Sequence, residues 1–422
     1  MAELVDAHVS GACVERREGS SPSFGTTITR ETFYGSLFLC LISSRLNQRT
    51  FALFSCCMSS SLSSLLPLND WPTRSGEPLL ISGPCSVESE EQYIQTAIAL
   101  AKTSRVHLLR GGIWKPRTRP NAFEGVGEQG LQWMVTARRE SGLPVMTEVA
   151  NAEHVEMCLK YGLDALWIGA RTTVNPFSVQ EIADALKGVD IPVFIKNPVN
   201  PDLQLWIGAL ERIQQAGITR IAAIHRGFSH FGDSIYRNKP MWEIPIALRT
   251  AYPNITLICD PSHICGRRDL LQGVAQKAMD LGYDGWMIES HLEPDKALSD
   301  AAQQVTPEAL VEMLVSIHVR QAQSDDLTFV HELQTLRSRM DKVDEEIIHL
   351  LGKRMRIAEE LGRFKKEESI TIFQIDRWKE ILETRTMLAE QVGLSKEFIL
   401  KYLEQLHKES IRTQTRVMNK RD

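Results

Sequence analysis

Between Leu79 and about Arg320 the chain alternates short strand-like runs with stretches of amphipathic helical periodicity. Such alternation is typical of parallel β/α units. The runs read LLISGPC, VHLLRGG, PVMTEV, ALWIGAR, PVFIKN, RIAAIHR, TLICDPSH and GWMIESH, and a helical stretch follows each. Eight units that close on themselves form a barrel, so the sequence predicts an α/β fold, a (β/α)8 TIM barrel, over this part of the chain.

The residues at the carboxyl ends of these predicted strands are polar or reactive. Catalytic groups of a (β/α)8 barrel come from this rim. In chain order the rim carries Cys85, Arg110, Glu148, Arg171, Lys196, Arg226, Asp260, His263, Glu289 and His291. A single charged residue at a strand end is usually a solvated terminus, but a set that recurs at all eight ends indicates an active site.

One subset of the rim combines soft and hard metal ligands. Its members are Cys85, His263, Glu289 and Asp300, the last in ALSDAAQQ just after the eighth run. A thiolate, an imidazole and two carboxylates suit Mn, Fe, Co or Zn better than Mg or Ca, which prefer oxygen ligands alone. A cysteine by itself is usually an inert small residue, so the argument depends on the convergence of all four. The sequence predicts a divalent metal ion as cofactor and leaves its identity among these four open.

The second subset of the rim is a group of cations. Its members are Arg110, Lys115, Arg171, Lys196 and Arg226. Such a group repels itself unless an anion lies within it, and phosphate and carboxylate groups are suitable anions because arginine binds them in a bidentate manner. Beside a Lewis-acid metal, this set indicates a reaction that polarises a carbonyl next to a bound phosphorylated acid.

Seven motifs together carry a family resemblance. GPCSVES, LLRGGIWKPRTRP, TEV, IGAR, DPSH, DGWMIESH and ALSDAAQQ resemble the type I 3-deoxy-D-arabino-heptulosonate 7-phosphate (DAHP) synthases, in the branch that is similar to the 3-deoxy-manno-octulosonate 8-phosphate synthases. The resemblance covers most of residues 77–320. It implies that phosphoenolpyruvate condenses with erythrose 4-phosphate to give DAHP, in the shikimate pathway of aromatic amino acid biosynthesis. An octulosonate 8-phosphate synthase is the alternative, but KPRT favours the four-carbon aldose.

The resemblance also implies roles for the rim residues. Cys85, His263, Glu289 and Asp300 are expected to bind the metal. Arg110, Lys115, Arg171, Lys196 and Arg226 are expected to hold phosphoenolpyruvate, and Lys115, Pro116, Arg117 and Thr118 to place the aldose and its phosphate. Lys115, Glu148 and His263 are the expected catalytic residues, with Glu148 guiding a water to C2, and Asp260 is a further substrate-binding residue.

The sequence departs from the family pattern at three places. Arg119 stands where serine is usual, and KNP after Ile195 stands where a Lys-Arg-Gly or Lys-Lys-Gly run is usual. IHRG stands where CERG is usual.

After the polar stretch QAQSDDLT the pattern changes to continuous helix. Apolar residues then recur in alternating steps of three and four, at Leu333, Leu336, Met340, Val343, Ile347, Leu350, Ile357, Leu361 and Phe364. Arg354 interrupts this seam at a position that should be core. Two further helices, at roughly 374–391 and 395–416, place Arg377 near the start of one, and Ser410 and Gln414 on one face of the other. The sequence therefore predicts an all-α domain of three helices after the barrel.

Residues 333–417 resemble the AroQ-type chorismate mutases, which are all-helical. By this resemblance Arg337, from a partner chain, and Arg354 hold the two carboxylates of chorismate, with Ser410 assisting. Lys365 and Gln414 hydrogen-bond the ether oxygen as chorismate rearranges to prephenate, and Arg377 supports the site. Mutases of this type are interlocked dimers, so at least a homodimer is implied.

Two departures in the helical segment leave its activity open. Trp378 stands where a glutamate is expected and Gln374 where an acidic residue is expected, so the substrate hydroxyl lacks its expected partner. One alternative is an allosteric sensor that binds chorismate or prephenate and regulates the barrel without turnover. A purely structural coiled coil is the other, and the set of Arg354, Ser410 and Gln414 argues against it.

The chain thus divides into residues 1–57, which we assign to no domain and interpret as a non-native extension, a barrel at 58–320, a linker at 321–328 and a helical domain at 329–422. The net charge of −5 gives no basic footprint for nucleic acid, and no apolar run approaches the ~20 residues of a membrane helix. The eight cysteines include no CxxC pair, which indicates a reducing, cytoplasmic location. We expect small-molecule substrates and no nucleic-acid or membrane partner.

Overall fold

A computed structural model describes residues 62, 65–71, 77–115, 123–321 and 323–420. The chain divides into two compact units, Met1–Arg320 and Gln321–Asp422. Three of the predicted substrate-binding residues, Pro116, Arg117 and Thr118, lie outside the described residues, as does the segment 1–57.

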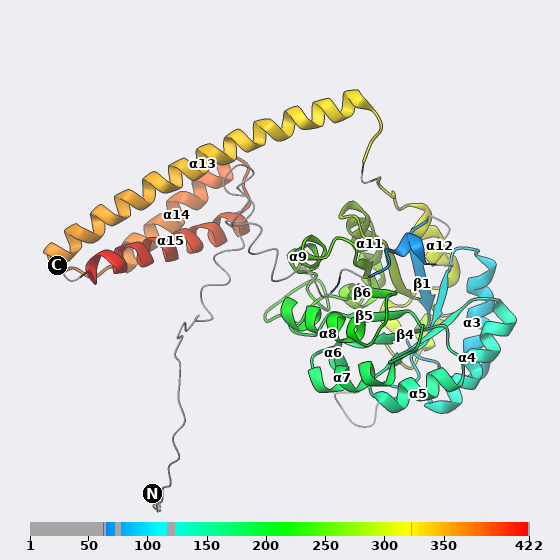
Figure 1. Cartoon of the computed structure of the whole chain (residues 1–422). Coiled ribbons are helices and arrows are strands. Elements are labelled where there is room, and N and C mark those ends of the chain that lie inside the picture. The colour runs from blue at the N-terminus through cyan, green and yellow to red at the C-terminus, as the bar shows by residue number, and fades with distance from the viewer. Residues whose placement is uncertain (1–61, 63–64, 72–76, 116–122, 322, 421–422) are drawn as a thin grey trace, which may run out of the picture. The chain divides into compact units, whose positions relative to one another are not determined.

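The first unit contains the closed barrel that the sequence predicts, with eight parallel strands in chain order (Figure 1). The strands are β1 Leu79–Gly83, β2 Leu108–Arg110, β3 Val145–Val149, β4 Ala165–Ile168, β5 Val193–Lys196, β6 Ile221–His225, β7 Thr256–Cys259 and β8 Gly285–Glu289. The barrel closes between β1 and β8, where Leu79 pairs with Gly285 and Gly83 pairs with Glu289. All carboxyl ends of the strands therefore meet at one rim.

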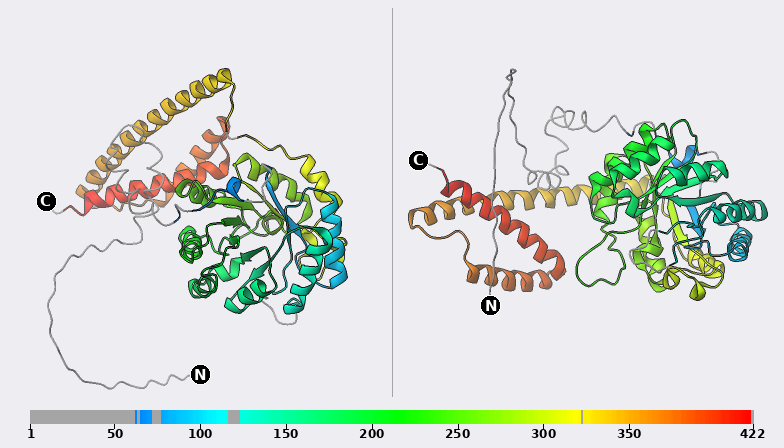
Figure 2. Two further views of the ribbon diagram at one scale, coloured as in Figure 1. Left: turned by 45° about the vertical axis from the view of Figure 1, so that its right-hand side comes forward. Right: turned by 90° about the horizontal axis from the view of Figure 1, so that it is seen from below.

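Helices surround the strands on the outside of the barrel (Figures 1 and 2). They are α3 Glu90–Lys102, α4 Glu128–Ser141, α5 Ala152–Lys160, α6 Ala170–Thr173, α7 Pro176–Ala185, α8 Leu203–Gln215, α9 Glu243–Ala251, α10 Pro261–Cys265, α11 Leu271–Asp280 and α12 Pro307–Val315. Local sequence explains several of their starts. Ser89, Asn151 and Asp202 each accept a backbone N–H in the first turn of the helix that follows, which stabilises that helix end.

The interior of the barrel is filled with side chains rather than open. Alternate strand residues such as Ile81, Met146 and Phe194 point inward and form one buried cluster. Trp71, from the segment before β1, joins this cluster and packs edge-on against Phe194 with ring centroids 5.7 Å apart. Trp71 and the packed interior fill the amino-terminal end of the barrel, and substrates of this fold bind at the opposite rim.

The second unit consists of three helices, as predicted: α13 Leu327–Glu367, α14 Ile375–Gln391 and α15 Lys396–Met418. α14 and α15 pack along the carboxyl-terminal half of α13, and its amino-terminal half extends beyond them (Figures 1 and 2). At Gly362 the helices approach closely, because a Cβ there would lie 3.1 Å from the Cα of Gln414. The close approach of α13 to α15 therefore depends on a glycine.

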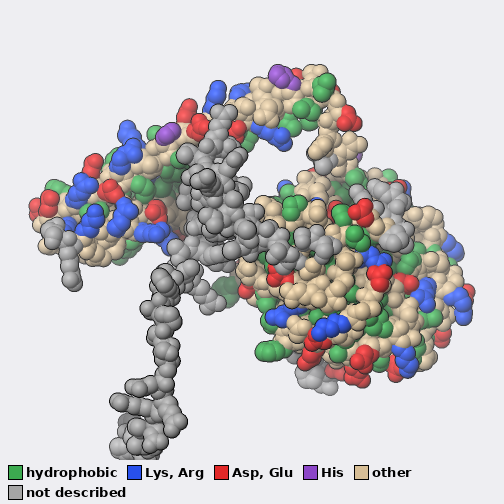
Figure 3. All heavy atoms as spheres, in the orientation of Figure 1, with side chains coloured by type: hydrophobic (Ala, Val, Ile, Leu, Met, Phe, Trp, Pro, Cys, Tyr) green, Lys and Arg blue, Asp and Glu red, His purple; other side chains and the backbone are tan. Residues whose placement is uncertain are grey.

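The predicted apolar seam of α13 is exposed along its amino-terminal half. The side chains of Leu336, Met340, Val343, Ile347 and Leu350 are 44 to 66% exposed. Near the start of the helix, Leu327, Phe329 and Val330 are also exposed, and Figure 3 shows hydrophobic side chains on the surface there. None of the helices in the described part of the chain combines the length and apolar character needed to cross a bilayer.

Candidate active sites

Three of the four predicted metal ligands converge at the barrel rim. Cys85 follows β1, Glu289 ends the neighbouring β8, and Asp300 lies in the loop after β8; their ligand atoms lie within 4.8 Å of one another. Sγ of Cys85 is 3.6 Å from Oδ2 of Asp300. Asp300 has a φ of 51°, in the left-handed region that few non-glycine residues adopt, and such backbone strain is concentrated at functional sites.

The fourth predicted ligand, His263, faces the same three residues. Asp260 caps α10 by accepting the backbone N–H of His263 at 3.1 Å, and its carboxylate also holds Nδ1 of the imidazole at 2.8 Å. Nε2 then lies 3.7 Å from Oε1 of Glu289 and 3.9 Å from Oδ2 of Asp300. A carboxylate on Nδ1 is the usual support of a metal-binding histidine, since it fixes Nε2 as the ligand atom.

The chemistry of this donor set fits a divalent metal ion. Oε1 of Glu289 is fully buried and has no hydrogen-bond partner among the described residues, although Arg110 forms an ion pair with it at 3.0 Å. Burial, aided by the charge of Glu289, raises the pKa of the Cys85 thiol to about 11. A bound cation in place of the thiol proton would satisfy both groups, because metal ligands bind as thiolates and carboxylates.

Four of the five predicted rim cations are partly or fully buried. Arg110 ends β2, Lys196 ends β5 and pairs with Asp260 at 2.8 Å, and Lys115 lies 3.3 Å from Sγ of Cys85. Arg226 follows β6 and donates to Oδ1 of Asn238 at 2.7 Å. Burial lowers the pKa of Arg226 to about 10, and the positive charges of Arg237 and Arg171 contribute to this shift. The fifth cation, Arg171, is exposed at the start of α6. Phosphate and carboxylate groups are the ligands that such cations favour.

Glu148, the predicted guide for a water molecule, is the penultimate residue of β3. Its Oε2 accepts the indole N–H of Trp167 at 3.1 Å. Gly169, the glycine of the IGAR motif, leaves room for this carboxylate, because a Cβ there would lie 2.0 Å from Oε1 of Glu148. The motif therefore positions Glu148 as well as Arg171.

Two departures from the family pattern lie on adjacent strands and support the rim. Asn197, after β5, accepts the backbone N–H of Arg226 at 2.7 Å and donates to the carbonyl of Gly227 at 2.9 Å. His225, at the end of β6, donates from Nε2 to the carbonyl of Pro240 at 2.6 Å and accepts the hydroxyl of Tyr283 at 3.0 Å. Both residues are fully buried and hydrogen-bonded, so each fits its position.

Sequence reasoning missed two residues of the metal cluster. Gln303 donates to Oε2 of Glu289 at 2.6 Å, and Arg237 forms an ion pair with Asp300 at 3.0 Å and donates to Gln303 at 2.7 Å. Gln303 stands in ALSDAAQQ beside the predicted ligand and could have been found from that motif. Arg237 lies in the long connection between β6 and α9, far from any strand end, and no sequence signal marked it.

The helical unit brings together four of its predicted residues. Arg354 of α13 donates to Oγ of Ser410 on α15, and Nε2 of Gln414 donates to the carbonyl of Ser410 at 3.4 Å. Lys365 is buried and donates to the carbonyl of Ile372 at 2.6 Å. Desolvation lowers the pKa of Arg354 and of Lys365. Two partly desolvated cations beside two hydrogen-bonding side chains form a site for an anionic ligand.

Of the other two predicted residues, Arg377 borders that group and Arg337 lies apart from it. Arg377, at the start of α14, pairs with Glu380 at 2.7 Å and lines, with Arg354, a groove of about 410 Å3 whose other walls are mostly apolar. Arg337 precedes Arg354 by 17 residues, about 25 Å along the same helix, so a single chain does not bring the two together.

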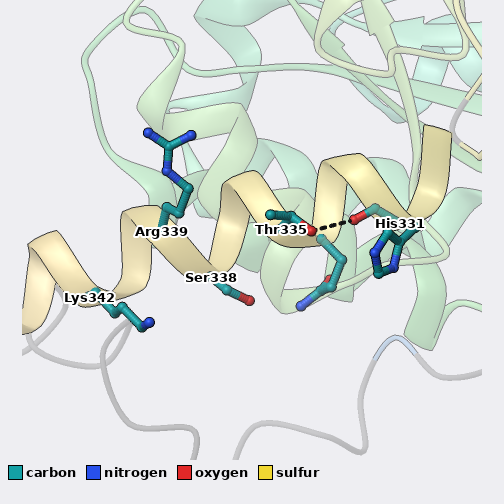
Figure 4. A pocket seen from close by; sticks show the side chains of 6 residues that line it. His331, Thr335, Ser338, Arg339 and Lys342 are labelled. Carbon is teal, nitrogen blue, oxygen red and sulfur yellow. Dashed lines mark hydrogen bonds between the residues drawn. The ribbon is translucent and has the colours of Figure 1, made fainter. Parts of the chain in front are cut away.

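A second hollow lies along the exposed half of α13. Its described lining comes from one helix and consists of His331, Gln334, Thr335, Ser338, Arg339 and Lys342 (Figure 4). The hydroxyl of Thr335 donates to the carbonyl of His331 at 3.0 Å. None of the predicted site residues is part of this lining.

The comparison with known families decides what this arrangement is. The profile of the DAHP synthetase I family matches residues 72–323, more than half of the chain. The chain belongs to the DAHP synthetase I family. Residues 336–415 also match the chorismate mutase type II family, so a DAHP synthase barrel and a chorismate mutase domain share one chain. The bifunctional shikimate-pathway enzyme that the sequence predicts is therefore confirmed.

Relatives with established names agree with this assignment. A phospho-2-dehydro-3-deoxyheptonate aldolase of Thermotoga maritima is 32% identical over 251 residues, which are 60% of this chain and 72% of that protein. Its crystal structure has a TM-score of 0.53 at 30% identity and covers 66% of this chain and 74% of that one. A 2-dehydro-3-deoxyphosphooctonate aldolase of Geobacter metallireducens is 28% identical over 253 residues, 54% of this chain and 86% of that protein. The DAHP synthase assignment needs no octulosonate alternative.

Proposed function

We propose that the barrel holds a divalent transition metal with Cys85, His263, Glu289 and Asp300 and condenses phosphoenolpyruvate with erythrose 4-phosphate there. The observation that carries this proposal is the convergence of a thiol, an imidazole and two carboxylates beside buried cations at one rim. When bound, the metal supplies Lewis acidity toward the carbonyl of the aldose. Metal analysis of the purified protein identifies the native ion among Mn, Fe, Co and Zn.

In this proposal the cations of the rim bind and orient the two substrates. Arg110, Lys115, Arg171, Lys196 and Arg226 hold the phosphate and carboxylate of phosphoenolpyruvate, so that its C3 faces the aldehyde carbon. Lys115, together with Pro116, Arg117 and Thr118, places the aldose and its phosphate. Glu148 then guides the water that adds at C2 before phosphate leaves, and its contact with Trp167 supports this role because it fixes the carboxylate.

Asp260 has a supporting role in the proposed site rather than direct contact with substrate. One carboxylate oxygen lies 2.8 Å both from Nδ1 of His263 and from Nζ of Lys196, and the side chain is fully buried. A residue engaged in this way orients a metal ligand and a substrate-binding cation together.

For the helical unit we propose that chorismate lies between α13 and α15 and rearranges there to prephenate. Arg354 and Ser410 bind one carboxylate, Arg337 of a second copy binds the other, and Lys365 and Gln414 hydrogen-bond the ether oxygen as its bond breaks. Arg377 adds positive charge at the edge of the site. Preorganised charge and a compact substrate pose supply the rate of such a pericyclic step.

A homodimer is part of this proposal because one chain leaves the site incomplete. The exposed seam of α13 from Leu336 to Leu350 is apolar and lacks a covering element in the described part of its own unit. The groove lined by Arg354 and Arg377 is largely apolar too, with Ile381, Leu388, Val392 and Leu406 among its walls. A second copy that lays its seam into this groove buries both surfaces and delivers Arg337.

We also infer the domain limits and the compartment of the protein. We place the barrel domain at 58–320, the linker at 321–328 and the mutase domain at 329–422; the division between Arg320 and Gln321 and the start of α13 at Leu327 support this. The described cysteines Cys85, Cys158, Cys259 and Cys265 are free thiols, which supports a reducing compartment such as the cytoplasm.

One experiment tests both activities on the full-length chain. The protein is stripped with a chelator and assayed for DAHP formation before and after the addition of each of the four metals; recovery with at least one metal supports the barrel proposal. Chorismate consumption is then measured for the parent, Arg354→Ala and the exposed control Arg356→Ala. We expect the rate of chorismate consumption to fall by about 100-fold or more in Arg354→Ala and to stay unchanged in Arg356→Ala. Synthase activity that survives without metal would contradict the barrel proposal, and full chorismate consumption by Arg354→Ala would contradict the role proposed for Arg354.

A further inference from the structure

His407 is a polar residue of the mutase site to which no role has been given. It lies on α15 three residues before Ser410 and seven before Gln414, so the three side chains share one face of the helix. Burial lowers the pKa of His407, and the positive charges of Arg354 and Lys365 lower it further. His407 is therefore a neutral imidazole at neutral pH. It lies close enough to Arg354 and Lys365 for their charges to lower its pKa.

Aromatic packing fixes the ring of His407. Trp378 stacks on it with ring centroids 4.1 Å apart and planes inclined by 19°, and Phe373 packs at 5.7 Å. Trp378 directly follows Arg377 in the first turn of α14, at the position where the sequence departs from its expected carboxylate. The indole therefore fixes the orientation of the imidazole ring near Arg354 and Lys365. The indole itself supplies no hydrogen-bond acceptor there.

Two polar atoms of this helix face have no partner. Nε2 of His407 and Oε1 of Gln414 are both buried and lack a hydrogen bond within the described residues. Leaving a buried polar atom unpaired costs roughly 1–3 kcal/mol, so each such atom in a native protein calls for a partner, such as a group of a bound ligand. Gln414 already belongs to the proposed substrate site, and the second unpaired atom extends that site by one residue.

We propose that Nε2 of His407 accepts a hydrogen bond from the ring hydroxyl of chorismate, with Trp378 as its positioning residue. This inference rests on the proposed mutase function. The cations of the site take the two carboxylates of the substrate, and a neutral imidazole offers an acceptor in the tautomer that leaves Nε2 unprotonated. The hydroxyl is the donor that chorismate has left to offer, so it matches the unpaired nitrogen.

The first test compares three variants of the full-length protein by kcat/KM for chorismate. His407→Phe keeps a stackable ring and removes the nitrogen, and His407→Gln restores an acceptor at a similar reach. His349→Phe, at an exposed position of α13, is the matched control. We expect His407→Phe to lose about tenfold, the worth of one hydrogen bond, while His407→Gln stays within about threefold of the parent and the control is unchanged.

The second test identifies the substrate group. Chorismate and its analogue with a methyl ether at the ring hydroxyl are compared for the parent and for His407→Phe. We expect the parent to discriminate against the ether by about tenfold and the variant to treat the two compounds alike. A variant that loses the same factor on both compounds, or that matches the parent on chorismate, overturns the proposal.

Folding is followed by the helical circular dichroism of each variant. If His407→Phe fails to fold, His407→Ala takes its place in both comparisons, since it removes the nitrogen without adding volume. A parent chain that consumes no chorismate overturns the proposed mutase function itself. A different outcome is an active parent in which replacing His407 leaves kcat/KM for chorismate unchanged; that outcome overturns only the role of His407.

Discussion

The carboxylate of Asp260 lies 2.8 Å from Nδ1 of His263 and 2.8 Å from Nζ of Lys196. One fully buried side chain thus orients a proposed metal ligand and a proposed substrate-binding cation. Burial by itself would raise the pKa of Asp260, but the charges of His263 and Lys196 hold it well below its ordinary value. The residue remains a carboxylate throughout the physiological range, and the geometry of the rim depends on it.

Asp260→Asn is expected to weaken metal binding by about 10–100-fold, because a neutral amide no longer fixes the imidazole of His263. Asp202→Asn is the matched control. Both aspartates are N-caps, of α10 and α8, and asparagine caps a helix equally well, so only the charge at the rim differs between the variants. Titration against a fluorescent metal chelator gives the affinities, and equal affinities for the two variants would count against the role of Asp260.

Cys85→Ala is expected to remove the sulfur from the metal site. Cobalt bound to a thiolate gives a charge-transfer absorption in the near ultraviolet, so the cobalt-loaded parent should show this band and Cys85→Ala should lose it. The loss of metal affinity in Cys85→Ala should exceed the about 10–100-fold loss that follows when a residue that only supports a ligand is replaced. Cys158→Ala is the control, since Cys158 is also buried but packs between α5 and the barrel core. A band that survives in Cys85→Ala would exclude the thiol as a ligand.

Ile347→Asp is expected to convert the dimer to monomers and to abolish mutase activity with it. An aspartate in the seam of α13 would have to be buried without a partner, and Arg337 would no longer reach the second site. Ser338→Asp adds the same charge on the opposite side of α13, nine residues and a half-turn away, and should leave both properties unchanged. Light scattering and chorismate consumption are measured at one protein concentration. An active, dimeric Ile347→Asp would contradict the proposed interface.

The lowered pKa of His225 is expected to reduce the stability of the barrel in mild acid. Burial lowers its pKa to about 4, whereas the unfolded chain titrates near 6.5. The folded state therefore binds fewer protons than the unfolded state between these values. The contribution of His225 to the free energy of unfolding, about 3 kcal/mol, is fully present above about pH 6.5. It is lost as the pH falls from there through 4.

Urea unfolding of the barrel at a series of pH values measures this contribution. His225→Asn removes the titration and should flatten the pH dependence between 4 and 6.5 relative to the parent. His331→Asn, at an exposed position of α13, should not alter it. Equal slopes for His225→Asn and the parent would show that another group is responsible.

The alternation of strand and helix signals was sufficient to predict the barrel. A strand that is buried on both faces and a helix with one apolar face leave distinct periodicities in the chain, and eight repeats of the pair leave few alternatives to closure. The three terminal helices were equally visible because each is long and has an apolar stripe. Helix positions near 374–391 and 395–416 lie within a few residues of α14 and α15.

Site residues at strand ends could be predicted for the same reason, since the fold dictates where those ends meet. Cys85, Lys196 and Glu289 needed only the strand pattern and their chemistry. Residues such as Arg237 and His407 could not be predicted in this way. Arg237 reaches Asp300 from a long connection, and His407 occupies an ordinary helical position.

The sequence by itself determined the order and kind of the elements, because local periodicity and capping act between residues close in the chain. It also determined which reactive groups lie at the rim. Only the tertiary structure decided which atoms are buried without a partner, such as Nε2 of His407, and which carboxylate serves two neighbours, as Asp260 does. Those properties arise from contacts between residues far apart in the chain, and no local pattern encodes their distances.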